Sequence, residues 1–146
     1  MKIKVNVIAT DEHGKKIWVD RDQLLLEAAF QILRDFVEKE NVRRIDWNHD
    51  ATHRAAWKEI SSLYRWWTKE RLRRKNPIDA KGVKCPPLET EPVPGSASVR
   101  LVPYDKKKYR PWTLACKKSW DLEVKWEQED QRNFHRLVEI RRFLWT

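Results

Sequence analysis

The sequence predicts an α+β protein that is mainly α, with three or four helices packed against a small N-terminal β-hairpin. Apolar residues recur every three or four positions in the stretches 22–40, 50–75 and 111–145, which is the spacing of one helical face. Residues 2–8 alternate instead between polar and apolar side chains, as a half-buried strand does. All seven prolines lie between Pro77 and Pro111, so we expect neither helix nor central strand there.

The predicted hairpin consists of residues 2–8, a polar turn with glycine at 11–14, and a second apolar stretch at 17–19. A hairpin alone is only marginally stable in water, so we expect it to pack on the helices. Residues 98–102 also have the composition of a strand. They are a candidate third strand of the same sheet.

Two helices are expected between the hairpin and the prolines. Asp20 or Asp22 is positioned to cap the first, which runs to about residue 40, and Asp50 is positioned to cap the second, which ends near Lys75. The first apolar stripe contains Leu26, Ala29, Leu33, Phe36 and Val37, and the second contains His53, Trp57, Ile60, Tyr64 and Trp67, widened by Ala56 and Leu63.

The closing region, residues 111–145, is predicted to be one bent helix or two helices with a break near Glu129 and Asp130. Pro111 suits the first turn because a proline there loses no helical hydrogen bond. A Pro-rich segment at 76–111 connects this region to the rest of a single domain, residues 1–146. Nine tryptophans, each able to bury roughly 150–250 Å², predict an aromatic core.

The chain has no apolar run near the roughly 20 residues that a membrane span needs, and its start does not resemble a signal peptide. Cys85 and Cys116 lie far apart without a C-x-x-C pair, which argues against a zinc knuckle or a disulfide framework. We therefore expect a soluble, cytoplasmic protein that does not contact a membrane.

Positive charge is concentrated in three segments. Residues 65–75 hold six Lys or Arg against one acid, residues 100–110 hold five against one, and residues 132–142 hold four against one, within a net charge of +9. Such a surface attracts nucleic-acid phosphates or an acidic protein. The candidate nucleic-acid-binding residues are Arg65, Trp66, Lys69, Arg73, Arg74, Lys106, Lys107, Lys108 and Arg142.

Trp66 is the tryptophan that we expect to be partly exposed. At about 100° per residue it lies roughly 110° from the centre of the second helix's apolar stripe, beside Ser62, Lys69 and Arg73. A base could stack on its ring while the neighbouring cations hold phosphates. The alternative is that Trp66 widens the core face and that the cations form a solvated helix end.

The segment 46–53 holds the densest group of possible metal ligands: Asp46, His49, Asp50 and His53. Two histidines four apart with two carboxylates suit zinc, manganese or iron. The alternative is structural, because Asp50 is also an N-cap candidate and His53 lies on the apolar stripe.

Familiar catalytic patterns are absent from the sequence. It contains no G-x-x-x-x-G-K-[ST], no G-x-G-x-x-G and no G-x-S-x-G, and only three glycines. We therefore predict no catalytic residue and no cofactor.

Several blocks of the chain are similar to one family of proteins. They include Phe-Val-Glu-Lys-Glu at 36–40, Ile-Asp-Trp at 45–47, Leu-Tyr-Arg-Trp-Trp at 63–67, Asn-Pro-Ile-Asp-Ala-Lys-Gly at 76–82 and the final Leu-Trp-Thr. The chain resembles a family of small, uncharacterised proteins encoded by tailed bacteriophages and prophages. This resemblance implies a role in the cytoplasm of an infected host cell and implies no chemistry.

Three classes of function follow from these observations. The preferred one is a phage accessory protein that contacts nucleic acid or a nucleoprotein through its concentrated basic surface. The second is an adaptor or inhibitor that binds a host or defence protein, since an acidic partner would suit the same charge. The third is a metal-dependent hydrolase at the 46–53 segment.

Overall fold

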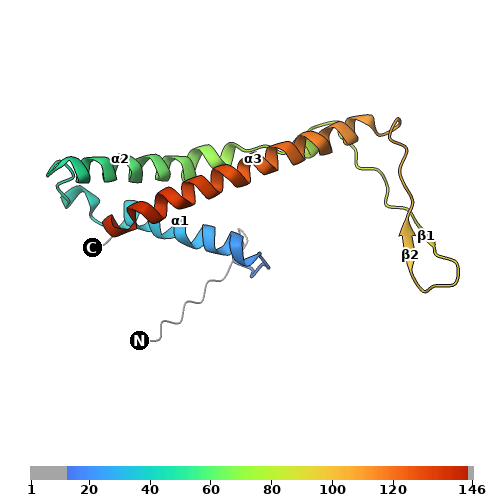
Figure 1. Cartoon of the computed structure of the whole chain (residues 1–146), viewed down its shortest axis with the longest axis horizontal. Helices are drawn as coiled ribbons and strands as arrows, with labels where there is room; N and C mark the ends of the chain where they lie inside the picture. The colour runs from blue at the N-terminus through green and yellow to red at the C-terminus, as the bar shows by residue number, and fades with distance from the viewer. Residues whose placement is uncertain (1–12, 145–146) are drawn as a thin grey trace. The chain divides into compact units, whose positions relative to one another are not determined.

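A computed structural model describes residues 13–144, and this part of the chain is mainly helical, as predicted (Figure 1). Its helices are α1 (Arg21–Lys39), α2 (Ala51–Arg65) and α3 (Arg110–Ile140). Its strands, β1 (Thr90–Pro92) and β2 (Val99–Leu101), form an antiparallel pair. Short 3₁₀ turns occupy Val42–Arg44, Arg71–Arg73, Pro77–Asp79 and Arg141–Phe143, and a π-helical turn occupies Trp66–Glu70.

Two compact units make up the chain. The first contains residues 1–73 and 129–146, and the second contains residues 74–128. The C-terminal part of α3 belongs to the first unit and the N-terminal part of α3 to the second. The expected Pro-rich segment therefore falls inside the second unit, and the single domain stays a prediction.

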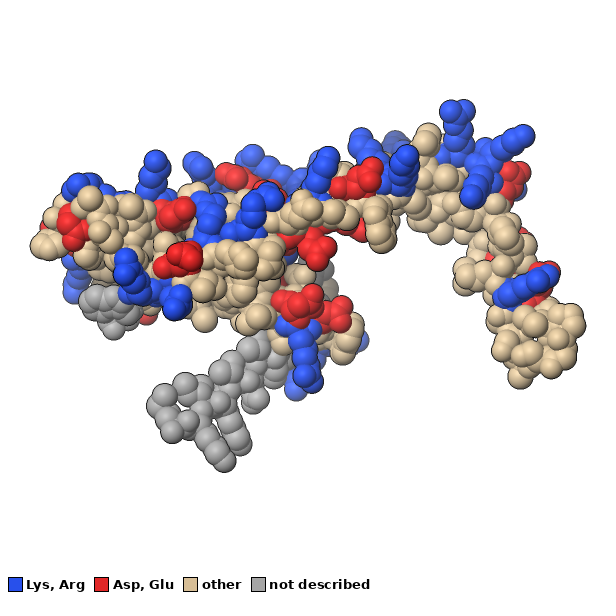
Figure 2. All heavy atoms as spheres, viewed as in Figure 1, with Lys and Arg blue, Asp and Glu red and all other residues tan. Residues whose placement is uncertain are grey.

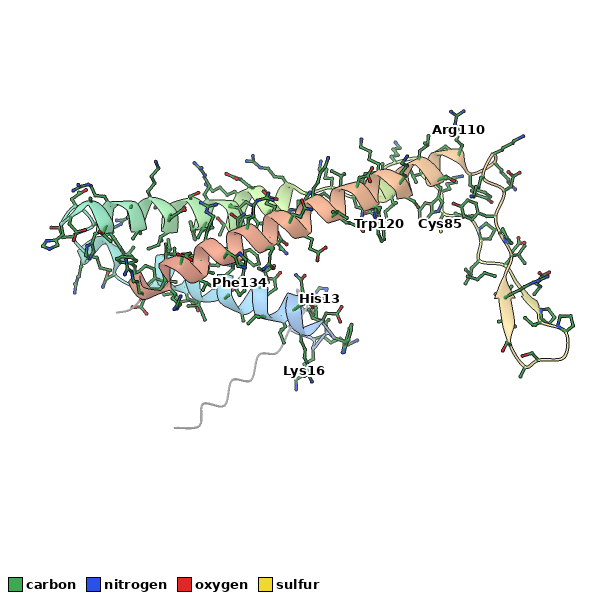
Figure 3. All side chains as sticks on the ribbon, viewed as in Figure 1. His13, Lys16, Cys85, Arg110, Trp120 and Phe134 are labelled. Carbon is green, nitrogen blue, oxygen red and sulfur yellow. The ribbon has the colours of Figure 1, made fainter. Side chains whose placement is uncertain are left out.

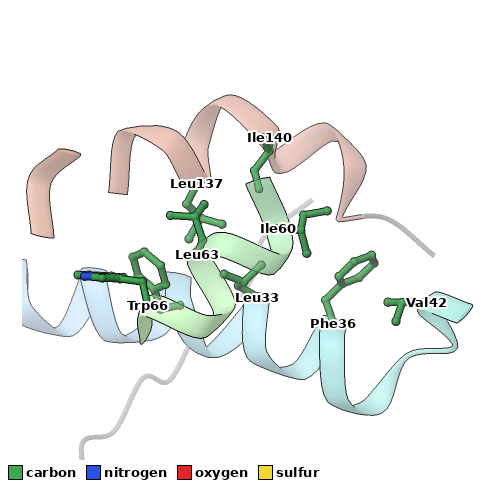
Figure 4. Close-up of a cluster of buried hydrophobic side chains, with 9 residues drawn as sticks. Leu33, Phe36, Val42, Ile60, Leu63, Trp66, Leu137 and Ile140 are labelled. Carbon is green, nitrogen blue, oxygen red and sulfur yellow. The ribbon is translucent and has the colours of Figure 1, made fainter. Parts of the chain in front are cut away.

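The core of the first unit lies between α1, α2 and the C-terminal part of α3. Figure 4 shows its side chains converging from all three helices. Partly buried aromatic rings surround it, among them Trp47, Trp57 and Trp67. The buried residues are Phe30, Leu33, Phe36, Val42, Ile60, Leu63, Trp66, Leu137 and Ile140. Trp66 is the one tryptophan among these buried residues, which are mostly aliphatic, so the predicted aromatic core is present mainly at its partly buried margin.

Polar contacts fix the angles between these helices. The Tyr64 hydroxyl of α2 donates to Glu38 Oε1 of α1 at 2.9 Å. Arg136 of α3 donates to both carboxylate oxygens of Glu59 at 3.2 and 2.5 Å and to the Ser62 hydroxyl at 3.1 Å. Because these partners lie on different sides of α2, this helix is covered by both of its neighbours.

The second helix keeps its α-helical form only to Arg65, ten residues short of its predicted end near Lys75. A π turn follows, closed by the bond from the Arg71 N–H to the Trp66 carbonyl. The Arg71 guanidinium lies 4.5 Å from the Trp67 ring centroid and bonds Asp130 of α3 at 3.2 Å and Glu27 of α1 at 3.4 Å. This arginine ties the end of α2 to both other helices.

The predicted helix starts are correct to within a residue. Asp50 caps α2, since its carboxylate accepts the His53 N–H at 2.8 Å. Asp20 precedes α1 without a side-chain cap bond. The Asp50 cap is the prediction confirmed in atomic detail.

The first strand of the predicted N-terminal hairpin, residues 2–8, lies outside the described part of the chain. Within residues 13–20, Lys16 makes an isolated β-bridge and the stretch 17–19 is not a strand. A third strand of that hairpin is not confirmed, although a strand does occur near 98–102, as β2. It pairs with β1, with Thr90 opposite Leu101 and Pro92 opposite Val99.

The β1–β2 ladder closes through a turn at Gly95, whose φ of +74° is one that glycine adopts without strain. The Val93 N–H donates to the Ser98 carbonyl at 3.0 Å, and Arg100 forms an ion pair with Glu91 across the ladder. Strands of three residues are among the shortest in proteins. The Pro-rich composition explains this, since proline cannot donate to a ladder.

The closing region is a single helix, α3, and the break considered near Glu129 and Asp130 does not occur. Pro111 lies in its first turn, as predicted. Asn76 of the 74–80 segment donates to Glu123 Oε1 at 3.1 Å, so this segment runs against α3 within the second unit. No helix within residues 13–144 combines the length and apolar character that crossing a bilayer requires.

Candidate nucleic-acid interface

One face of α2 carries only basic charge. Arg54, Lys58 and Arg65 lie within about 40° of one another around the helix axis and span about 17 Å along it. All three side chains are exposed, and Lys69 continues the row in the π turn that follows. Figure 2 shows Lys and Arg side chains projecting along the side of α2 that is turned away from α1. We call these four residues, Arg54, Lys58, Arg65 and Lys69, the α2 basic face.

Acidic side chains do little to neutralise this face. Glu59 is the one acid in the α2 sequence, and its carboxylate binds Arg136 of α3. Glu70 forms an ion pair with Arg65 at 3.1 Å, but both side chains are about half exposed or more. An exposed pair of this kind is worth little and is screened by salt. Most of the positive potential of the face therefore reaches solvent.

The other predicted basic residues of the first unit are not part of this row. Arg73 is exposed in the 3₁₀ turn beyond the π turn. Arg142 lies over the Phe143 ring at 4.9 Å, and Phe143 contacts His53 in the first turn of α2. Since His53 and Arg65 are separated by about 18 Å of helix, Arg142 and the residues after Arg65 lie at opposite ends of α2.

Arg74 opens the second unit and has a structural contact. Its guanidinium donates to the Trp126 carbonyl at 3.4 Å and lies 5.7 Å from that indole ring. With Lys75 and Lys118 it also lines an open hollow of about 590 Å³. Asp79 is the acid in this lining. The lining of the hollow therefore has a net positive charge, although the Arg74 guanidinium already contacts Trp126 of α3.

Lys106, Lys107 and Lys108 form an exposed turn immediately before α3, which we call the lysine turn. Asp105 shapes it, because its Oδ1 accepts the backbone N–H groups of Lys107 at 2.8 Å and Lys108 at 3.2 Å. This carboxylate is occupied by the backbone, so the three ammonium groups project from a fixed turn. Lys108 Nζ lies 5.4 Å from the Tyr109 ring centroid.

Trp66 is not exposed, and the expectation that a base could stack on it is wrong. Its side chain is 4% exposed, and its ring lies 5.2 Å from that of Phe30 and 5.9 Å from that of Trp67. It lies one turn beyond Ser62, on the side of the helix where Glu59 and Ser62 bond Arg136 of α3. The alternative, that Trp66 widens the core face, describes the structure.

An exposed tryptophan does occur beside a cation, but in the second unit. Trp120 is 69% exposed and follows Lys117 by three residues on α3, so the two side chains are neighbours on the helix surface. Arg110 lies in the first turn of the same helix, as Figure 3 shows. This is the combination of aromatic surface and positive charge that the sequence predicts at Trp66.

Two of the metal-ligand candidates, Asp46 and Asp50, accept hydrogen bonds from neighbouring residues of the same segment. Asp46 accepts the Asn48 N–H at 3.0 Å, and Asp50 accepts both the His53 N–H and, at 2.9 Å, a hydrogen bond with His53 Nδ1. These bonds lower the pKa of Asp50 to about 2, the backbone N–H of His53 being the largest cause. The His49 and His53 rings meet edge to face at 5.7 Å. Within residues 13–144, no three His, Cys, Asp or Glu side chains come close enough to hold one ion.

Arg54, Lys58 and Lys117 were missed by the sequence reasoning. A signal for the first two was available, because they are four residues apart on the helix face opposite the apolar stripe. The net charge of a stretch of sequence does not reveal them, since the adjacent Glu59 cancels part of their positive charge.

Comparison with protein-family models, with curated proteins and with solved structures found no match to this chain.

Proposed function

We propose that this chain is an accessory protein of a tailed phage that binds nucleic acid or a nucleoprotein in the host cytoplasm. The α2 basic face and the lysine turn hold phosphates. The observation that carries the proposal is the alignment of Arg54, Lys58 and Arg65 on one exposed helix face while Glu59 is turned to α3. A row of cations at helical spacing offers successive phosphates a series of partners.

This binding depends on the phosphate backbone and only weakly on sequence. Lysine ammonium groups act as point charges and carry no base information. The affinity falls steeply with salt, because each phosphate that is neutralised releases counterions. Single strands gain an additional contact at Trp120, where an unpaired base can stack beside Lys117.

The test is a salt series on a double variant, Lys58→Ala/Lys69→Ala, with fluorescent single-stranded and duplex DNA. Each lost contact reduces the slope of log K against log salt by about 0.7 for a single strand and about 0.9 for a duplex, so the pair removes about 1.4 to 1.8. The matched control, Arg21→Ala/Arg34→Ala, removes the same charge from exposed positions of α1. Equal slopes for the two double variants would refute a role for the α2 basic face.

A protein partner is the second candidate, and exposed apolar residues of the second unit favour it. Val99 and Leu101 of β2 are 64% and 62% exposed, and Leu114 of α3 is 57% exposed. Val99 and Leu101 lie on the same face of β2, and large exposed apolar side chains that lie together are typical of protein interaction sites. Capture of host proteins by the purified chain, with and without nuclease, separates the two functions: nucleic-acid binding predicts that nuclease removes the captured proteins.

A further inference from the structure

A hollow of about 400 Å³ lies in the first unit where α1 ends and α2 begins. Ile45, Trp47 and Phe143 give it apolar walls, and Glu40, Asn41 and His53 contribute polar groups. Its volume falls within the range of small-molecule sites, which combine flat apolar walls with a few convergent polar groups. None of the basic residues of the α2 basic face lines it.

The aromatic walls are held in place by packing. The Trp47 indole N–H donates to the Val42 carbonyl at 2.9 Å, and the ring stacks on Trp57 at 4.9 Å and meets the edge of Phe36 at 6.4 Å. On the other side, Phe143 meets the edge of His53 at 5.6 Å. The site therefore offers flat surfaces that need no rearrangement before a planar ligand binds.

Apart from Lys39, the polar groups that line the hollow are mainly acceptors. Asp50 bonds His53 through Nδ1 at 2.9 Å, so in the neutral ring this nitrogen carries the proton and Nε2 is left as an acceptor. The Glu40 carboxylate accepts only, and the Asn41 amide can both donate and accept. A ligand that fits is flat and presents N–H groups at its edge.

Positive charge lies close to the hollow. Lys39 lines it and forms an ion pair with Asp35 at 2.8 Å. Arg142 covers the Phe143 ring at 4.9 Å. A flat, N–H-bearing ring attached to a phosphate matches these walls, acceptors and cations together. A nucleotide has this combination, and an aromatic side chain of a peptide lacks the phosphate.

We propose that this hollow binds one unpaired nucleobase, with an exocyclic amino group directed to His53 Nε2 or Glu40. Adenine, cytosine and guanine carry such a group, whereas uracil and thymine do not. The inference extends the proposed nucleic-acid binding by adding a base site to phosphate contacts. It is tested separately, because a nucleoside has no phosphate for the α2 basic face to hold.

The experiment titrates the full chain with adenosine, cytidine, guanosine and uridine by isothermal titration calorimetry. We expect uridine, which lacks an exocyclic amino group, to bind about tenfold more weakly than the other three, which corresponds to one lost hydrogen bond. Glu40→Gln should weaken adenosine binding by a similar factor, because it removes the negative charge and replaces one of the two acceptor oxygens by an NH2 donor. The matched control is Glu139→Gln, an exposed position of α3 that does not line the hollow.

Two further arms identify the source of the base and separate this proposal from the previous one. A comparison of AMP with single-stranded oligo(dA) shows whether the base arrives on a free nucleotide or on a strand, and preferential binding of either supports base recognition. Lys58→Ala/Lys69→Ala should leave adenosine affinity unchanged. Absence of adenosine binding at millimolar concentration, with oligonucleotide binding intact, would overturn the base site alone. Equal binding of all four nucleosides and of indole would also overturn it.

Discussion

Replacing Trp66 by alanine decides between a core residue and a base-stacking residue. The side chain is 4% exposed and touches Phe30 and Trp67, so its removal leaves a large cavity beside these two rings. Truncation of a buried tryptophan or phenylalanine to alanine costs about 3–5 kcal/mol. Since domains of this size are stable by about 5–15 kcal/mol, the variant should lose roughly a fifth or more of its free energy of unfolding.

The assay is equilibrium unfolding in urea, read by circular dichroism at 25 °C, with the midpoint and the slope compared between variants. Trp120→Ala is the control, because a tryptophan that is 69% exposed should change the free energy of unfolding by about 0.5 kcal/mol or less. The reasoning fails if Trp66→Ala unfolds within about 1 kcal/mol of the wild type and instead loses affinity for single-stranded DNA.

Three further predictions concern polar contacts of the first unit. Arg71→Met should lower the free energy of urea unfolding by about 1.5–3 kcal/mol, because it leaves the carboxylates of Glu27 and Asp130 without their partner. Arg65→Met should lower it by less than about 1 kcal/mol, because the pair that it breaks with Glu70 has side chains that are 67% and 49% exposed. The stability that Asp50 contributes is fully present above about pH 4 and is lost as pH falls toward about 2, since the pKa of Asp50 is lower in the folded state than in the unfolded state; thermal melts of Asp50→Ala should therefore vary less with pH in this window than those of the wild type. Tyr64→Phe should raise the pKa of Glu38, because the Tyr64 hydroxyl is the largest cause of its lowering, and an NMR titration that shows no change would contradict the interhelical hydrogen bond.

The helices could be predicted from the sequence because local signals agree with one another. The Asp50 cap, the three-four spacing of the apolar residues and the position of Pro111 each depend on residues within one or two turns. The prediction for the closing region left open one helix or two, and the uninterrupted α3 shows that Glu129 and Asp130 do not break it. Acidic residues have adequate helix propensity, so their presence in mid-helix costs little.

The exposure of Trp66 could not be predicted, because it depends on a contact distant in the sequence. Glu59 and Ser62 make their face of α2 look solvent-facing, and Trp66 follows at the next turn of the same face. Arg136, 77 residues after Glu59, binds both polar side chains and brings α3 over this face. A helix between two neighbours buries a wider arc than its apolar stripe indicates.

The partner of the strand at 98–102 could not be predicted from the sequence, for a related reason. Its composition predicted a strand but not a partner, and the nearest segment able to pair is β1, seven residues before β2. Sequential strands pair more often than distant ones because a short loop costs less entropy to close. Pro92 at the end of β1 concealed the partner, since proline argues against a strand interior and is compatible with an edge strand.

The packing of the helices also affects the electrostatic potential on the α2 basic face, because it determines where the acidic side chains lie. In the first unit, Glu27 and Asp130 bind Arg71, and Glu59 binds Arg136, so these acids are directed to contacts between helices. Pairs at such contacts cannot turn outward to neutralise Lys58 or Lys69 without breaking the helix packing. The potential on the outer face of α2 therefore exceeds what the balance of acidic and basic residues in the same stretch of sequence suggests. The variant Glu59→Gln tests this directly, because it removes the one acid of α2. It should alter the affinity for phosphates little, because the Glu59 carboxylate lies against Arg136 and not on the α2 basic face.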